Sequence, residues 1–309
     1  MKAIANAMQA MAKNGTGSGA KGYGTKRSLT NGHMCARMHA QRRTHIHIGR
    51  VFGICVEKCS ELPANCPRRN NNYRVVFQGN NVTDQKWEWA IFQDLGSHPA
   101  NLQAGTVVEC YACFPAHCCQ QSGADQACVQ AWLNGANTWI VLPREAWPLA
   151  LFYEDGSPMY EQPVLLLLRA LYGHPDAGTF WEHHCGEVIV KHIGFGPVET
   201  WPSCYYHSKW HLLLTVYVDY FKMSGPEKCM NVAWKELQTY IEMEEPAEAN
   251  LYLGCNFKFT EHRSKHDLVR KVLYDMKDYL TSSSSLYQKV CVAARGIEAT
   301  LRKSSYPIY

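Results

Sequence analysis

Hydrophobic and polar residues alternate along several short segments, a pattern that predicts β-strands. Strands are expected over 73–78, 138–142 and 251–259, and 47–56 is expected to form a strand pair or one strand with a bend. A buried apolar segment is expected over 164–171. A hairpin is expected from 204–207 and 211–217, and its second strand runs into Val218-Asp219-Tyr220.

Three other segments repeat apolar residues every three or four positions, as amphipathic helices do. The helices are expected over 181–193, 230–241 and 268–280. Gly194 stands where the C-cap of the first helix belongs, and a serine run at 282–285 follows the last one. Strands and helices are mixed without regular β-α-β alternation, so the sequence indicates the α+β class with an antiparallel sheet.

Charge is unevenly distributed along the chain. Positions 1–50 contain nine lysines and arginines and no acidic residue, which leaves 22 of the 31 basic residues, against all 27 acidic ones, for positions 51–309. A basic, acid-free segment is typical of a nucleic-acid-binding tail and also of a solvated linker, and both interpretations stay open. The first thirteen residues lack the Arg and Ser density of a transit peptide, and no secretory signal follows Lys2.

Fourteen cysteines raise the question of disulfides or a metal site. Because no secretory signal is present, reduced thiols are expected. The densest group of possible zinc ligands is Cys110, Cys113, His117, Cys118 and Cys119. These five residues crowd into ten positions, whereas a structural zinc site joins two separated ligand pairs. Zinc binding is therefore an alternative, and free thiols are the default interpretation.

No stretch of the sequence approaches the roughly 18 consecutive apolar residues of a membrane-spanning helix, so we expect none. An aromatic content of 12% argues against a disordered chain. The sequence does not define a localisation, but the cytoplasm or nucleus is expected rather than secretion.

Six segments occur in an order that resembles one known family. They are YRVVFQGN (73–80), DQACVQAWLNG (125–135), ALYGHPDAGTFW (170–181), GFGPV with SCYYH (194–207), LLLTVYVDY (212–220) and LYLGC (251–255). Their order and spacing resemble the reverse transcriptase of copia-type retrotransposons over residues 46–290. No single motif is decisive, but six motifs in the correct order are specific.

The resemblance implies a right-hand polymerase fold with fingers, an antiparallel palm sheet and a truncated thumb. It divides the chain into a basic flexible N-terminal arm (1–45), fingers and palm (46–260), and the start of a thumb or connection helix with a tail (261–309). It also implies RNA-directed DNA polymerase activity. The implied partners are an RNA template, a DNA primer and deoxynucleoside triphosphates, and the implied cofactor is Mg²⁺.

Nucleotidyl transfer in this family uses two divalent ions that lie about 3.5–4 Å apart. Mg²⁺ prefers oxygen ligands, so two or three carboxylates must converge from neighbouring strands. By resemblance, one Asp ends the first palm strand and two adjacent Asps lie on the hairpin turn. Asp219 matches the first hairpin Asp, but Tyr220 stands at the second position and Gly123 stands at the palm-strand position.

Asp125 lies two residues from that palm-strand position, up to about 6.6 Å along a strand, so it could replace the lost Asp only after a rearrangement. Cys128 stands at the aromatic position that, by resemblance, is a steric gate against a nucleotide 2′-hydroxyl. The catalytic candidates are therefore Asp219 and Asp125, with Asp219 as the metal ligand. Glu109 is a further carboxylate whose distance from these two decides whether an acidic group forms.

Arg74 matches the Arg of the family's fingers strand, which faces the incoming triphosphate, and the Lys usually found two residues earlier is Asn72 here. Tyr217 matches a residue under the primer end, with an ordinary strand aromatic as the alternative. Four tryptophans are candidates for stacking on bases: Trp87, Trp89, Trp139 and Trp147. Packing in the core is the interpretation that we favour for them.

The sequence thus predicts a retrotransposon-derived reverse transcriptase domain that keeps the fold and has lost most or all of its activity. Two missing carboxylates imply a rate loss on the order of 10⁴-fold or more. Whether the chain acts as an enzyme stays open. The alternatives are a non-catalytic protein that binds RNA or template–primer, and a small zinc-binding protein.

Overall fold

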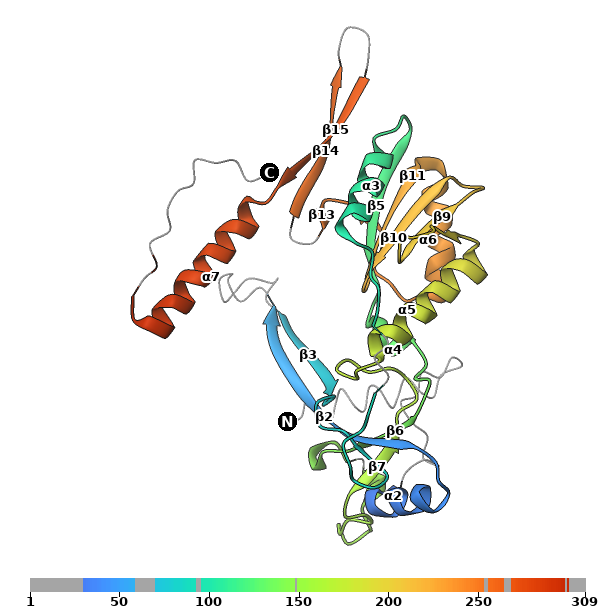
Figure 1. Cartoon of the computed structure of the whole chain (residues 1–309), viewed down its shortest axis with the longest axis vertical. Helices are drawn as coiled ribbons and strands as arrows, with labels where there is room; N and C mark the ends of the chain where they lie inside the picture. Colours follow the sequence, from blue (N-terminus) through green and yellow to red (C-terminus); the bar gives the residue numbers. More distant parts are fainter. Residues whose placement is uncertain are drawn as a thin grey trace.

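The computed structural model describes residues 30–58, 70–92, 96–147, 149–252, 255–263, 268–297 and 299. Within these ranges the chain forms three β-sheets with helices packed on them, which is the α+β class that the sequence indicates (Figure 1). Over the same ranges, no helix has both the length and the apolar content needed to cross a membrane.

The first sheet, which we call the N-terminal sheet, has the order β1-β7-β6-β2-β3, and β4 also pairs with β2. Its strands are β1 (Thr30–Asn31), β2 (Ile46–Lys58), β3 (Asn70–Phe77), β4 (Thr83–Asp84), β6 (Asn137–Val141) and β7 (Pro163–Leu166). The strands expected over 47–56, 73–78 and 138–142 are thus confirmed. The second half of β2 pairs with β3 and not with β6, so these two strands extend from the sheet as a ribbon.

The second sheet, which we call the central sheet, is antiparallel with the order β12-β5-β11-β10-β9-β8. Its strands are β5 (His117–Gly123), β8 (Gly196–Pro197), β9 (Cys204–His207), β10 (Leu212–Tyr217), β11 (Tyr220–Pro226) and β12 (Ala247–Glu248). Helix α6 (Glu227–Tyr240) connects β11 to β12, and helix α5 (Ala177–Glu187) follows β7 within the longer segment that leads from β5 to β10. Antiparallel pairing of β5 with β11 brings the end of β5 beside the β10–β11 turn.

The central sheet has a helix layer on each face. Side chains on alternate positions of β10 and β11, such as Leu214 and Phe221, pack with Trp181 of α5 and Trp234 of α6. The opposite face is covered by α3 (Leu102–Ala112). The sequence prediction for α5 is confirmed, since a π-helical turn (Val188–Ile193) continues it to Gly194, which has a φ of +91°.

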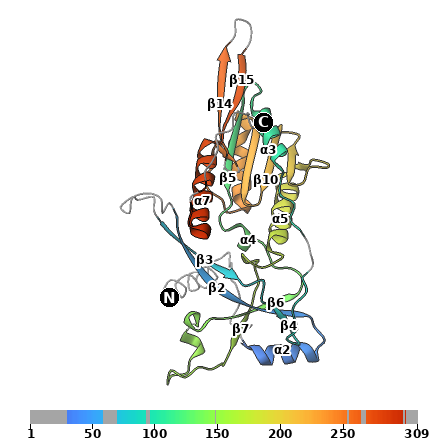
Figure 2. The same ribbon diagram turned by 60° about the vertical axis from the view of Figure 1, so that its left-hand side comes forward.

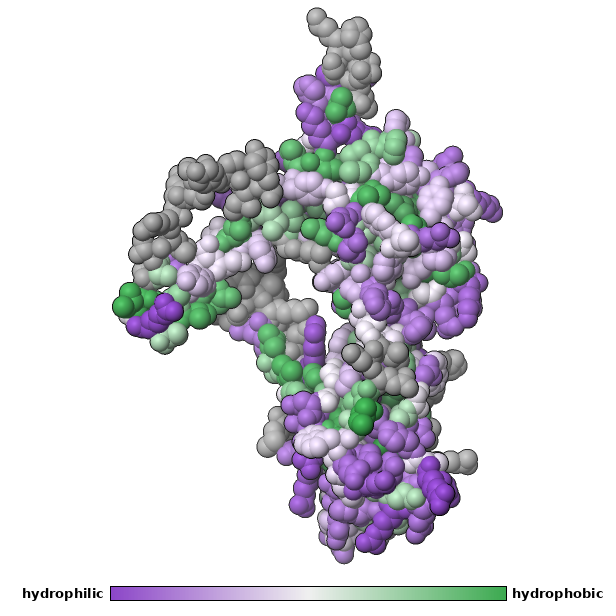
Figure 3. All heavy atoms as spheres, in the orientation of Figure 1, coloured by the Kyte–Doolittle hydropathy of each residue, from purple (hydrophilic) through white to green (hydrophobic). Residues whose placement is uncertain are grey.

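The third sheet, which we call the C-terminal sheet, contains β13 (Leu251–Tyr252), β14 (Cys255–Arg263) and β15 (Leu268–Asp275). The β14–β15 hairpin projects from one end of the molecule (Figures 1 and 2). Helix α7 (Lys277–Arg295) follows it and has no buried residue. Figure 3 shows an open space between α7 and the rest of the molecule, with hydrophobic side chains at the far end of this helix.

Two predictions for the C-terminal part were wrong. The single strand expected over 251–259 is two strands, because Leu251 pairs with Asn256 and Tyr252 pairs with Cys255. The helix expected over 268–280 is instead strand β15, followed by α7, which contains the serine run. The apolar residues of β15 fit the two-residue period of a strand and the 3.6-residue period of a helix. Eight antiparallel pairs with β14 select the strand.

The expectation of a flexible arm over 1–45 is wrong for residues 32–41, which form a helix. Helix α2 occupies Gly32–Gln41, and the Asn31 side chain caps it by accepting a hydrogen bond from the His33 N–H. Cys35 and Ala36 are buried against β2, β6 and β7, so two small side chains anchor this helix to the sheet. Residues 1–29 of the expected arm lie outside the described residues.

Candidate functional site

The turn between β10 and β11 consists of Val218 and Asp219. Val218 has a φ of +57°, a conformation that a β-branched residue rarely adopts. Two hydrogen bonds hold this turn. Trp181 Nε1 of α5 donates to the Val218 carbonyl oxygen at 2.6 Å, and the Ala124 N–H donates to the Asp219 carbonyl oxygen at 2.8 Å. The surrounding packing therefore fixes Asp219 at the tip of the hairpin.

Strand β5 ends beside this turn, with Gly123 directly opposite Tyr220. The Glu244 N–H donates to the Gly123 carbonyl oxygen at 2.8 Å. A Cβ atom at position 123 would lie 3.6 Å from Glu244 Oε2. The Glu244 carboxylate thus lies where a side chain at position 123 would project, while Tyr220 is 58% exposed.

Asp219 shares its surroundings with Cys128 of α4 (Ala127–Gln130) and with Tyr172. Burial, and then the Asp219 carboxylate, raise the pKa of Cys128 to about 11. Burial also raises the pKa of Tyr172 to about 12, with smaller contributions from Cys128 and Asp219. Both groups are therefore uncharged near neutral pH. The guanidinium carbon of Arg74 lies 5.8 Å from the centre of the Tyr172 ring, so β3 reaches the same region.

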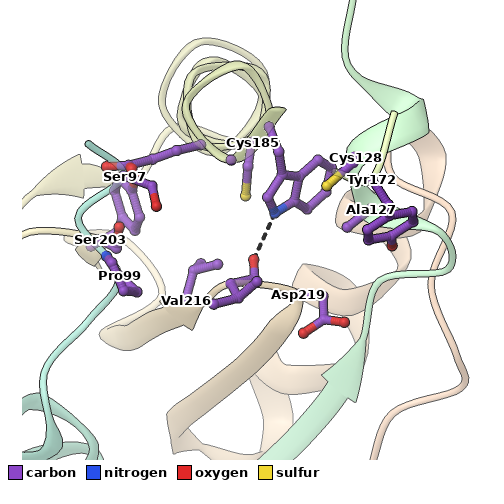
Figure 4. Close-up of a pocket in the computed structure, with 14 residues that line it drawn as sticks. Ser97, Pro99, Ala127, Cys128, Tyr172, Cys185, Ser203, Val216 and Asp219 are labelled. Atoms are coloured by element: carbon purple, nitrogen blue, oxygen red, sulfur yellow. Dashed lines mark hydrogen bonds between the residues drawn. The ribbon is translucent and has the colours of Figure 1, made fainter. Parts of the chain in front are cut away.

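A small cavity lies between α5 and this end of the central sheet (Figure 4). Its volume is about 60 Å³, which holds a few water molecules rather than a nucleotide. The Trp181 indole crosses it to reach the Val218 carbonyl, and burial raises the pKa of Cys185 in its wall. Figure 4 shows the Asp219 carboxylate at the edge of the cavity, away from Cys185.

Glu109 lies in different surroundings from Asp219, whereas Asp125 directly follows Ala124, whose N–H donates to the Asp219 carbonyl oxygen. The exposed Asp125 follows β5, and its backbone N–H donates to the Glu242 carbonyl oxygen at 2.8 Å. Glu109 is buried in α3, where Lys222 Nζ donates to its Oε1 at 2.5 Å and the Tyr274 hydroxyl donates to its Oε2. Glu109 is thus part of a separate buried ion pair.

Tyr217 ends β10 opposite Tyr220, so Tyr217, Tyr220 and Gly123 form one row across three strands. Its ring packs edge-on against the Tyr252 ring, with centroids 6.2 Å apart. This contact joins the central sheet to the C-terminal sheet near the Asp219 turn.

The three positions that carry metal ligands in the resembled family supply one carboxylate, Asp219. The described residues contain no group of three or more His, Cys, Asp or Glu side chains placed to hold a metal ion. A pair of Mg²⁺ ions needs several converging oxygen ligands. The donor set at Gly123, Asp219 and Tyr220 therefore does not fit such a pair.

The cysteine-rich segment is divided between two cores. Cys118 packs against the cluster that includes α5 and α6, whereas Cys119 packs on the other face with Val108 of α3. The His117 ring nitrogen Nδ1 lies 2.8 Å from the Pro115 carbonyl oxygen. Because neighbouring residues of β5 alternate between faces, Cys118 and Cys119 do not converge on one ion.

Sequence reasoning assigns no role to three residues of this site, namely Tyr172, Trp181 and Glu244. Tyr172 belongs to the Leu-Tyr-Gly segment, which supports the resemblance only through its place in the order of motifs. Trp181 lies on a helix, as predicted, but its hydrogen bond to the hairpin turn has no signal in the sequence. Glu244 lies far from Gly123 along the chain, and only the return of the chain after α6 brings them together.

Comparison of this sequence with models of known protein families and with curated proteins finds no match.

Proposed function

We propose that this chain is a reverse-transcriptase-like domain that retains the fingers and palm and has lost most or all nucleotidyl transfer. The observation that carries the proposal is the position of Asp219. Asp219 lies at the tip of the β10–β11 hairpin. Gly123 ends β5, which pairs with β11, so the two residues lie at the same end of the central sheet. The resemblance requires this adjacency between the hairpin and the first palm strand.

Two further contacts support the same assignment. Cys128, at the steric-gate position, lies close enough to Asp219 for the carboxylate to raise its pKa. Arg74, at the fingers position, lies over the Tyr172 ring at the same edge of the site. Residues that the resemblance assigns to one nucleotide site thus come from β3, α4 and the hairpin turn to one region.

The expected loss of activity follows from the ligand chemistry. Two of the three carboxylate positions carry Gly123 and Tyr220, which provide no negative charge for a metal ion. Loss of charge stabilisation costs several kcal/mol for each ligand, and about 1.36 kcal/mol is a tenfold loss of rate. We therefore expect primer extension at least about 10⁴-fold slower than in a chain with the full set.

The test is a repaired chain. Gly123→Asp with Tyr220→Asp restores the two carboxylates, and adding Glu244→Gln removes the negative charge that would otherwise lie against residue 123. We expect no extension of a DNA primer on an RNA template by the wild-type chain with Mg²⁺ and deoxynucleotides. We expect measurable extension by the triple variant.

The matched control is the triple variant with Asp219→Asn, which should lose the restored extension. Robust synthesis by the wild-type chain would overturn the claim of lost activity. A folded triple variant that neither binds template–primer nor extends it would contradict the assignment to this class.

A further inference from the structure

Two of the four tryptophans are on the surface, contrary to the packing role that we favoured for all of them. Trp139 is 7% exposed, as expected, and Trp147 Nε1 donates to the Leu142 carbonyl oxygen. Trp87 is 45% exposed and Trp89 is 71% exposed. We refer to Trp87, Trp89 and Ile91, together with His33 and Arg37 of α2, as the tryptophan surface.

The backbone directs these side chains outward. The Ala90 N–H donates to the Val82 carbonyl oxygen, and Ala90 packs against the core of the N-terminal sheet. Because neighbouring residues in an extended segment alternate, Trp89 and Ile91 project to the solvent. The Asp84 carboxylate accepts hydrogen bonds from the Lys86 and Glu88 N–H groups, so the loop that carries Trp87 is held in place.

Helix α2, beside this loop, contains one arginine and no acidic residue. The His33 ring lies 5.0 Å from the Trp87 ring, and Arg37 is one helical turn further along the same face of α2. Positions 30–50 contain four arginines and no acidic residue, and Lys86 adds a cation within the loop. The acidic residues of the loop are Asp84, whose carboxylate is engaged by the backbone, and the exposed Glu88.

Exposed indole rings beside cations indicate which kind of partner fits the tryptophan surface. Exposed indole rings are sequence-tolerant platforms for stacked bases, and neighbouring cations follow the phosphate backbone. An apolar protein segment would cover the indoles but would leave Arg37 and Lys86 without an anionic partner. The charge therefore favours an anionic polymer with flat rings over a hydrophobic partner.

We propose that the tryptophan surface binds single-stranded nucleic acid. This site is separate from the Asp219 turn, because α2 lies at the end of the molecule opposite the β14–β15 hairpin, away from the central sheet (Figures 1 and 2). The inference goes beyond the proposed function, since it requires neither a metal ion nor the palm carboxylates.

Fluorescence anisotropy of a labelled 12-nucleotide oligouridylate, measured with the full chain over a series of salt concentrations, tests this proposal. We expect Trp89→Ala to weaken binding by roughly five- to thirty-fold, as for loss of one stacked base, without changing the salt dependence. We expect Arg37→Ala to reduce the slope of log affinity against log salt by about one.

The matched control is Tyr153→Ala. Tyr153 is an aromatic residue with 56% exposure, but it is followed by Glu154 and Asp155. We expect this variant to bind as the wild-type chain does. Unchanged affinity in folded Trp89→Ala, or an equal loss in Tyr153→Ala, would overturn the proposal.

Sedimentation of the same proteins distinguishes another occupant. If Trp89→Ala dissociates an oligomer and leaves oligonucleotide affinity unchanged, the surface is an interface between copies of this chain and the proposal is wrong. Because Trp89 is outside the Asp219 site, these results do not depend on whether the repaired chain extends a primer.

Discussion

At the residue scale, the backbone of Val218 is the clearest sign that the hairpin turn is under special constraint. A left-handed conformation costs an L-residue about 1–2 kcal/mol, and branching at Cβ makes it less favourable still. The hydrogen bonds to Val218 and Asp219 from Trp181 and Ala124 hold the turn in this form. Strain of this kind persists where the surrounding structure determines it, often at functional sites.

We predict that Val218→Gly stabilises the folded chain by up to about 1 kcal/mol. Glycine adopts a positive φ without a steric cost, and the 52% exposed Val218 side chain loses little buried area. Its greater freedom in the unfolded chain offsets part of the gain. The free energy of unfolding from urea titration measures this effect.

Val232→Gly is the control, because Val232 is similarly exposed but lies within α6. Glycine there should lower the free energy of unfolding by a few tenths of a kcal/mol or more. If both variants were destabilised equally, Val218 would not be a strained residue.

At the scale of elements, one buried ion pair joins four segments. Lys222 of β11 and Glu109 of α3 are 2% and 3% exposed at their side chains, and the Tyr274 hydroxyl of β15 donates to Glu109. The Lys222 ammonium also lies 3.4 Å from the centre of the Tyr252 ring of β13. Burial lowers the pKa of Lys222, and its hydrogen bond to Glu109 opposes that effect. The pair therefore attaches the C-terminal sheet to the central sheet.

We predict that Glu109→Gln alone lowers the free energy of unfolding by about 3–5 kcal/mol, because it leaves the Lys222 charge buried without its partner. The double variant Glu109→Gln with Lys222→Met should recover much of this loss, since neither charge remains. Urea unfolding of the four proteins in a double-mutant cycle gives the coupling energy. Additive effects would show that the two side chains do not act as a pair.

The elements that sequence patterns predicted well are those with a single dominant period. Helices α5 and α6 and strands β2, β3 and β6 have one clear apolar face, so local pattern and tertiary packing agree. The residues of β15 fit a strand and a helix equally, and only pairing with β14 decides between them. Helix α2 is anchored by Cys35 and Ala36, which are too small to give a periodic signal.

The residues of the candidate site likewise include some that the sequence predicted and some that it did not. Asp219 and Tyr220 could be placed at a hairpin turn from the local pattern, whereas Gly123 is assigned only through the resemblance, because no strand is expected over 117–123. Glu244 could not be found, since its position over Gly123 depends on the path of the chain after α6. Glu109 is acidic like Asp219, but its buried partner Lys222 has no local signal.

At the scale of the whole molecule, the N-terminal and central sheets are linked through the segment that precedes α5. The Phe77 N–H of β3 donates to the Tyr172 carbonyl oxygen at 2.7 Å. Nearby, the Phe92 ring contacts the rings of His47 and His174, with centroids 4.5 Å and 5.3 Å away. Both histidines are buried, at 4% and 5% exposure, so the link contains two titratable groups in an apolar setting.

Burial lowers the pKa of both His47 and His174 to about 4, from an ordinary value near 6.5. Between these two pH values the unfolded chain binds more protons than the folded chain, so stability falls as pH decreases. Above pH 6.5 both states are neutral at these positions and the contribution is constant. Each histidine should lower the free energy of unfolding by about 1.4 kcal/mol per pH unit inside the window.

We predict that His47→Phe reduces the slope of stability against pH by about 1.4 kcal/mol per pH unit, because it removes one titrating group and keeps an aromatic ring against Phe92. Urea unfolding at several pH values between 4.5 and 8 measures the slope for the wild-type chain and the variant. Val232→Ala is the control, since Val232 is exposed on α6 and carries no titrating group, and its slope should match the wild type. An unchanged slope in His47→Phe would mean that His47 is already protonated in the folded chain. Burial of His47 would then not be a cause of the loss of stability at low pH.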